Sequence, residues 1–129
     1  MSALLLEEDA QGKVKEIYRE IKAAFGMVPN FFKAQAALDP EWLELNWNRE
    51  KKIMLEERAL DRKTKELIAL AVSLVHRCEY CSVTHEMMAR MTGATPRQIV
   101  ETKEVVELFS GFTAIADSLR VPLDASPKK

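Results

Sequence analysis

The sequence lacks the features that mark several large classes of protein. Its 129 residues contain two cysteines, four glycines and five prolines, which excludes a disulfide-rich scaffold and a low-complexity chain. It also lacks an excess of positive charge, because 19 lysines and arginines are balanced by 20 acidic residues, for a net charge of -1. This balance gives no support to nucleic acid or an anionic membrane surface as the main partner.

Long hydrophobic runs are missing as well. The longest apolar stretch, residues 67–75, is about half as long as a membrane span and contains Ser73. The short run at residues 4–6 has no basic residue before it and acidic residues at 7–9 after it, so it does not resemble a signal peptide. We therefore expect a cytoplasmic protein that does not bind a membrane.

The alternation of apolar and polar residues that is typical of a half-buried strand is not found either. What recurs is the helical spacing of three and four residues. It predicts helices over residues 8–25, 31–38, 40–55, 62–76 and 78–92, a short helix opening at Thr95, and a last helix over about 103–119. The sequence thus predicts an all-α fold of about six to seven helices in a single domain, 1–129, with a loose tail over about 122–129.

The two cysteines that are present stand close together, at Cys78 and Cys81, and His85 follows four residues later. Residues three and four apart are neighbours on a helix. The two thiols can therefore close a disulfide across the first turn of a helix that begins at Cys78, and the imidazole of His85 can reach Cys81. In a cytoplasmic protein this spacing indicates redox chemistry or metal binding.

The residues alone leave three interpretations of this cluster open. The first is a dithiol redox site, in which the helix N-terminus favours a thiolate at Cys78 and the histidine favours one at Cys81. The second is zinc with His76 as a fourth ligand, although on a continuous helix His76 points away from Cys78, and no second ligand pair exists elsewhere. The third is a pair of buried thiols without chemistry.

Helical periodicity also assigns faces to the two helices around the cluster. On the helix over 78–92 it predicts that the core face is made of Tyr80, Val83, Met87 and Met91. On the preceding helix, Glu66 shares a stripe with Arg62, Ser73 and Arg77. Periodicity alone therefore places Glu66 on the solvent face.

The stretch Glu66-x11-Cys78-x-Tyr80-Cys81-x3-His85 resembles the active-site signature of the AhpD-like alkylhydroperoxidases, within the carboxymuconolactone decarboxylase superfamily. Three further segments are similar to the peroxidase-related branch of that superfamily: 28–32, 62–70 and 93–95. The resemblance extends over roughly residues 26–115, and five positions match at fixed spacing. Tyr80 stands where well-studied members have a histidine.

The resemblance implies an all-α fold assembled into trimers or hexamers, and a thiol peroxidase that needs no cofactor, metal or haem. In the family pattern the second cysteine, here Cys81, attacks the peroxide and becomes a sulfenic acid, and Cys78 resolves it to a disulfide. His85 and Glu66 form a proton relay. The resemblance therefore reverses the placement of Glu66, which now faces the cysteines, and requires the chain to turn near residues 76–77.

The leading hypothesis is thus a peroxidase that reduces hydrogen peroxide or small organic hydroperoxides. A dithiol reductant, either a lipoyl-bearing or a thioredoxin-like protein, would restore the cysteine pair. The alternatives are a lactone decarboxylase-like enzyme of the same superfamily, which needs no redox-active cysteines, and a non-catalytic redox-sensing oligomer. An apparent excess of apolar and aromatic residues over 27–55, including both tryptophans, separately predicts a homo-oligomer.

Overall fold

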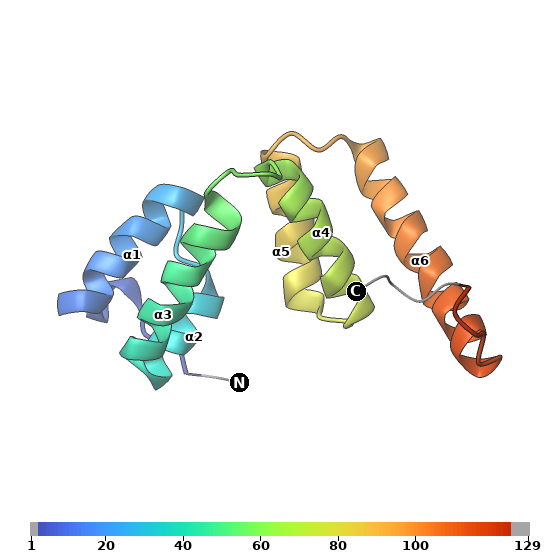
Figure 1. Ribbon diagram of the computed structural model, residues 1–129. Coiled ribbons are helices and arrows are strands. Elements are labelled where there is room, and N and C mark those ends of the chain that lie inside the picture. The colour runs from blue at the N-terminus through green and yellow to red at the C-terminus, as the bar shows by residue number, and fades with distance from the viewer. Residues whose placement is uncertain (1–2, 125–129) are drawn as a thin grey trace. The chain divides into compact units, whose positions relative to one another are not determined.

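The computed structural model describes residues 3–124. Over these residues it contains helices and turns and no β-strand, which confirms the all-α prediction. The helices are α1 (Gly12–Phe25), α2 (Asn30–Leu38), α3 (Pro40–Glu50), α4 (Arg62–Val75), α5 (Glu79–Met91) and α6 (Pro96–Ser118), with a short 3-10 turn (Glu7–Asp9) and a π-helical turn (Lys51–Leu55) (Figure 1). No helix in the described part of the chain is long and apolar enough to cross a membrane.

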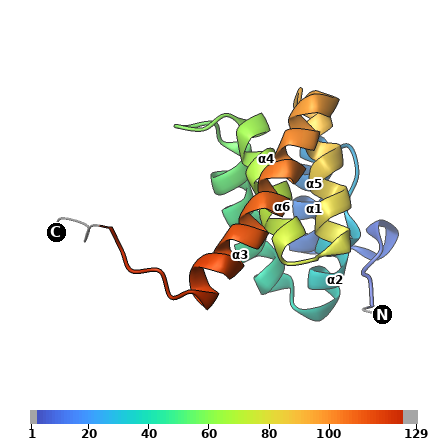
Figure 2. The same cartoon turned by 90° about the vertical axis from the view of Figure 1, so that its right-hand side faces the viewer.

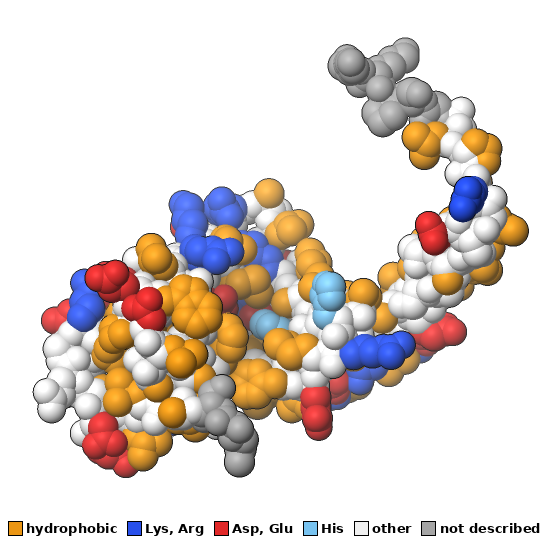
Figure 3. Space-filling model, turned by 90° about the horizontal axis from the view of Figure 1, so that it is seen from below, with side chains coloured by type: hydrophobic (Ala, Val, Ile, Leu, Met, Phe, Trp, Pro, Cys, Tyr) orange, Lys and Arg blue, Asp and Glu red, His pale blue; other side chains and the backbone are white. Residues whose placement is uncertain are grey.

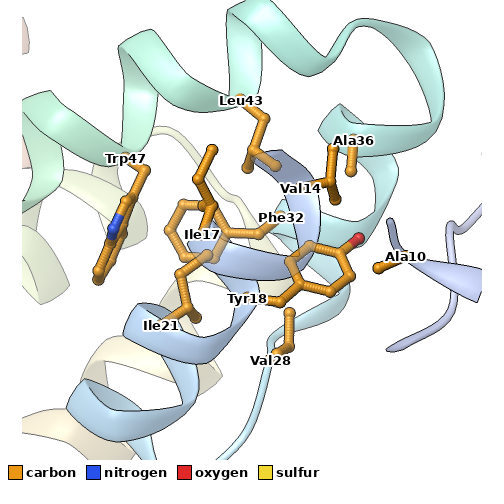
Figure 4. Packing of buried hydrophobic residues seen from close by; sticks show 10 residues of the cluster. All are labelled: Ala10, Val14, Ile17, Tyr18, Ile21, Val28, Phe32, Ala36, Leu43 and Trp47. Carbon is orange, nitrogen blue, oxygen red and sulfur yellow. The ribbon is translucent and has the colours of Figure 1, made fainter. Parts of the chain in front are cut away.

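The chain divides into two units, one ending at Glu56 and one beginning at Glu57. The first unit holds α1 to α3 around an apolar core, whose side chains point toward one another in Figure 4. These are Ala10, Val14, Ile17, Tyr18, Ile21, Val28, Phe32, Ala36, Leu43 and Trp47. Each of the larger aliphatic side chains buried here contributes about 1.5–3 kcal/mol relative to the exposed state.

The second unit holds α4, α5 and α6. α4 and α5 lie side by side, and α6 packs against α4 (Figures 1 and 2). Their shared core is small and consists of Leu70, Ala89, Ala94 and Ile99. Asp61 is the N-cap residue of α4. Its carboxylate accepts the Thr64 N–H at 2.7 Å, and this bond holds the pKa of Asp61 below its ordinary value.

The C-terminal part of the second unit differs from the prediction. Instead of a short helix at Thr95 and a separate helix from 103, the structure has one continuous helix over Pro96–Ser118. The predicted start is right, because Thr95 and Gln98 form a capping box. No glycine or proline stands between the two predicted helices, and the Thr102 hydroxyl donates to the Gln98 carbonyl at 2.9 Å, so nothing interrupts the backbone there.

The predicted core face of α5 is wrong. Its four residues, Tyr80, Val83, Met87 and Met91, are between 45% and 66% exposed. The buried residues of α5 are Met88 and Ala89, and those of α4 are Glu66, Leu70 and Ser73. The two helices therefore bury small and polar side chains together with Leu70 and Met88, and leave other apolar side chains exposed.

In the first unit, one polar contact supports the aromatic core. The buried indole N–H of Trp47 donates to a carboxylate oxygen of Glu20 at 2.7 Å, and Lys51 contacts the same oxygen at 2.9 Å. These two contacts hold the pKa of Glu20 below its ordinary value, and the hydrogen bond from the Trp47 indole has the larger effect. A carboxyl group with a lowered pKa in the folded state stabilises the fold above the ordinary pKa, and this contribution disappears as the pH falls.

We predict that Glu20→Ala lowers the free energy of unfolding by about 1 kcal/mol at pH 7, because the buried indole N–H loses its acceptor. Glu16→Ala is the matched control, since Glu16 lies on the same helix with an exposed side chain. Urea unfolding at pH 7 and at about pH 3 measures both variants, and the deficit of Glu20→Ala should shrink at the lower pH. Equal losses in the two variants would show that the Trp47 contact contributes nothing.

Candidate functional site

The turn between α4 and α5 positions the two cysteines. α4 ends at Val75, and Arg77 adopts a left-handed backbone conformation with φ of 55°. The Cys78 N–H then donates to the Ser73 carbonyl at 3.0 Å, which fixes the turn to the end of α4. This confirms the predicted change of direction near residues 76–77, and it brings α5 back alongside α4.

Cys78 and Cys81 are joined as a disulfide, with their Cα atoms 5.3 Å apart, within the usual range for a disulfide. Cys78 is the N-cap residue of α5, and its sulfur accepts the Cys81 N–H at 3.3 Å. The sulfur of Cys78 therefore lies at the positive end of the helix dipole, which stabilises negative charge on that atom after reduction. The prediction that the pair lies at a helix N-terminus is confirmed.

A carboxylate–imidazole pair joins α4 to α5. Oε2 of Glu66 lies 2.8 Å from Nδ1 of His85, and the Glu66 side chain is only 3% exposed, against 26% for His85. The placement of Glu66 on the solvent face is therefore wrong, and the buried position expected from the resemblance is the one observed. An ionised carboxylate only accepts hydrogen bonds, so beside it Nδ1 is the donor and the other ring nitrogen can accept a proton.

The structure adds Arg62, a residue to which sequence reasoning assigned no role. It lies one turn before Glu66 on α4, with its Nε atom 4.0 Å from Oε1 of Glu66 and a side chain that is 24% exposed. The signal was present in the sequence, since Arg62 and Glu66 share a stripe four residues apart. It was missed because that stripe was assigned to the solvent.

His76 does not join the other three candidate ligands. It is the exposed C-cap residue of α4. Over residues 3–124 no group of three or more His, Cys, Asp or Glu side chains is placed to hold a metal ion. The zinc interpretation thus has no geometric support in this part of the chain, and what the site brings together is a disulfide, an imidazole, a carboxylate and a guanidinium.

Residues 40–124 match the sequence model of the carboxymuconolactone decarboxylase family. A crystal structure of the alkylhydroperoxidase AhpD core from Rhodospirillum rubrum matches this fold with a TM-score of 0.90 and 33% sequence identity, over 96% of this chain and 93% of that one.

Two curated proteins match shorter stretches. "Uncharacterized protein 4 in cox locus" of Paracoccus denitrificans is 41% identical over 69 residues, 54% of this chain. The alkyl hydroperoxide reductase AhpD of Mycobacteroides abscessus is 33% identical over 52 residues, 40% of this chain. The matched stretches span 58% and 30% of the lengths of these two proteins.

Proposed function

This chain belongs to the carboxymuconolactone decarboxylase family, and within that family we propose that it is a thiol-dependent peroxidase for hydrogen peroxide or small organic hydroperoxides. One observation carries the proposal: a cysteine pair at a helix N-terminus precedes, on the same helix, a histidine that is held by a buried carboxylate. The similarity to alkylhydroperoxidases supports it. The general arrangement of nucleophile, base and orienting acid is the one that activates weak nucleophiles in other enzymes.

In the oxidative half of the cycle, Cys81 is the attacking thiol. His85 accepts its proton, the thiolate attacks the distal peroxide oxygen, and the O–O bond breaks as the proton passes to the departing alcohol or water. Cys81 is then a sulfenic acid. The thiolate of Cys78 attacks that sulfur, one water leaves with the addition of a proton, and the disulfide forms.

The two cysteines have different electrostatic support. A helix terminus at the surface contributes about 0.3–1 kcal/mol to a thiolate at Cys78. For Cys81 the support is a base that takes the proton itself, and the carboxylate of Glu66 stabilises the imidazolium that results. We therefore keep Cys81 as the peroxide-attacking residue and Cys78 as the resolving one.

The cap at Cys78 has its use in the reductive half of the cycle. A thiolate of the dithiol reductant attacks Cys81, the disulfide breaks, and Cys78 leaves as a thiolate that the Cys81 N–H stabilises. A thiol whose thiolate is stabilised is the better leaving group in such an exchange. The second thiol of the reductant then displaces Cys81 and becomes part of the reductant's own disulfide. A lipoyl-bearing or thioredoxin-like protein supplies this chemistry.

Turnover separates this proposal from the alternatives. We predict continuous loss of peroxide when the protein is supplied with an excess of dihydrolipoamide, and no loss with Cys81→Ser, because the cycle needs the pair. Peroxide consumption followed in time is the measurement. His76→Gln, which replaces the exposed histidine, is the control and should consume peroxide at the wild-type rate. Loss of one equivalent followed by arrest would instead indicate a redox sensor, and no loss at all would favour a decarboxylase-like enzyme.

The assignment of the two cysteines is tested by trapping sulfenic acid with dimedone and locating the adduct by mass spectrometry. We predict that Cys78→Ser accumulates the adduct on Cys81, and that Cys81→Ser reacts slowly. His85→Ala should slow trapping at Cys81 by about a hundredfold, the lower range for loss of a general base. Glu66→Gln should slow it less. Trapping on Cys78 at the wild-type rate in Cys81→Ser would reverse the assignment.

The surface of α6 supports the proposal of a homo-oligomer. Five apolar side chains recur at helical spacing along it and are between 44% and 56% exposed: Val105, Leu108, Phe109, Phe112 and Ile115. Figure 3 shows apolar side chains along this helix, which leads to the C-terminal tail. A monomer seldom leaves so continuous an apolar stripe in water. We propose that a second copy of the chain covers it, in a trimer or hexamer.

We predict a solution mass that is a multiple of 14.7 kDa. A combined Phe109→Asp and Phe112→Asp variant should lower this mass, because two charges would have to be buried in the interface. Ser110→Asp is the matched control, since it adds a charge to the opposite side of α6. Light scattering at micromolar concentration is the measurement, and a wild-type mass near 14.7 kDa would contradict the proposal.

A further inference from the structure

Three ionisable side chains are neighbours in the candidate site: Arg62 at the start of α4, Glu66 one turn later, and His85 on α5. The Nε atom of Arg62 lies 4.0 Å from one oxygen of the Glu66 carboxylate, at ion-pair rather than hydrogen-bond distance, and Nδ1 of His85 lies 2.8 Å from the other oxygen. The carboxylate is almost fully buried, and the Nε and Nη2 atoms of Arg62 are shielded from solvent. In such surroundings charges are screened much less than at the surface, so that the charge on one group affects proton binding at the next.

The positive charge of Arg62 and the negative charge of Glu66 have opposite effects on proton binding at His85. A guanidinium is permanently charged and cannot give up its proton to the carboxylate. The guanidinium partly neutralises the negative charge of Glu66. Without the guanidinium, the carboxylate would stabilise the protonated form of the His85 ring more strongly.

Other charged groups lie on the elements around the pair. Glu57 accepts the backbone N–H of Arg62 at 3.3 Å, and Asp61 caps α4 beside it. On α5, Glu86 is paired with Arg90 and with Lys103 of α6 at 2.9 and 2.7 Å. Each of these groups has its own hydrogen-bond or ion-pair partner. Of the arginines named here, Arg62 is the one that lies within ion-pair distance of Glu66.

We propose that Arg62 is a positioning residue that limits the basicity of His85 through Glu66. The proposal rests on the proposed function for its purpose. His85 must take the thiol proton of Cys81 and then release it to the departing alcohol or water. If Glu66 acted on the ring alone, the imidazolium would release its proton less readily, and fewer molecules would begin the next cycle with a free base. Arg62 keeps the ring able to do both.

The test is a titration of the His85 ring by two-bond proton–nitrogen NMR on the full-length, oxidised protein. In the disulfide form the two cysteines do not titrate, so the curve reports on the imidazole. The chain has two histidines, and His76→Gln identifies the resonances of His85. The measurement needs no peroxide, so it stays valid even if the protein proves not to be a peroxidase.

We expect Arg62→Met to move the midpoint of the His85 titration upward by about one pH unit, a tenfold tighter hold on the proton. Arg62→Lys keeps the positive charge and should return the midpoint toward the wild-type value. Arg97→Met is the control, since Arg97 is an exposed arginine paired with Glu101 and Glu104 on α6. It should leave the midpoint unchanged.

The variants are expected to fold, because Arg62 lines an open pocket with Glu57, Asp61, Lys63, Thr92 and Gly93. A shorter side chain there opens onto water rather than leaving a sealed cavity. Arg62→Gln, which retains polar atoms without charge, provides a second neutral variant if the methionine does not fold. A folded neutral variant with the wild-type midpoint, or a lysine variant that behaves like the neutral ones, would overturn the proposal.

Discussion

The arrangement of the second unit depends on one buried carboxylate. Glu66 lies in the contact between α4 and α5, where a charge without partners would cost several kcal/mol. His85 from α5 lies 2.8 Å from one of its oxygens, and the guanidinium of Arg62 from α4 lies 4.0 Å from the other. This requirement fixes which faces of the two helices meet, and since Cys81 precedes His85 by one turn on α5, it also fixes the side on which the cysteine pair lies.

Packing through that polar contact has a consequence for the rest of the surface. α4 and α5 meet through residues such as Leu70, Ser73 and Ala89, while the apolar stripe of α4, with Ile68 and Val72, remains exposed. The core of this unit is correspondingly small. Burial of the Glu66–His85 pair therefore leaves large apolar faces without a partner inside the unit, and this is the physical link between the site and the proposed assembly.

The sequence predicts what local signals determine. The caps at Asp61 and Thr95 and the all-α class follow from local sequence patterns, and the structure confirms them. The turn before Cys78, which the structure also contains, was expected only from the family resemblance. The sequence could not predict which face of a helix would be covered. Periodicity states which residues share a face, but Tyr80 and Glu66 were both placed on the wrong side because the partner helix, not the pattern, decides burial.

For Glu66, the family resemblance supplied the information on burial that periodicity lacks. By periodicity alone, a carboxylate on a polar stripe is a surface residue. Leu70, an apolar residue on the same stripe, is the one sign in the sequence that the stripe is covered. The resemblance to the family signature, in which this glutamate and the histidine belong to one proton relay, then implied that the carboxylate faces the cysteines. The resemblance gave no role to Arg62, because the active-site signature does not include this residue. A signature of this kind lists the reacting groups and omits the residues that balance the charge of those groups. Such residues are found once the burial of each ionised group, and the charge that must accompany it, has been accounted for.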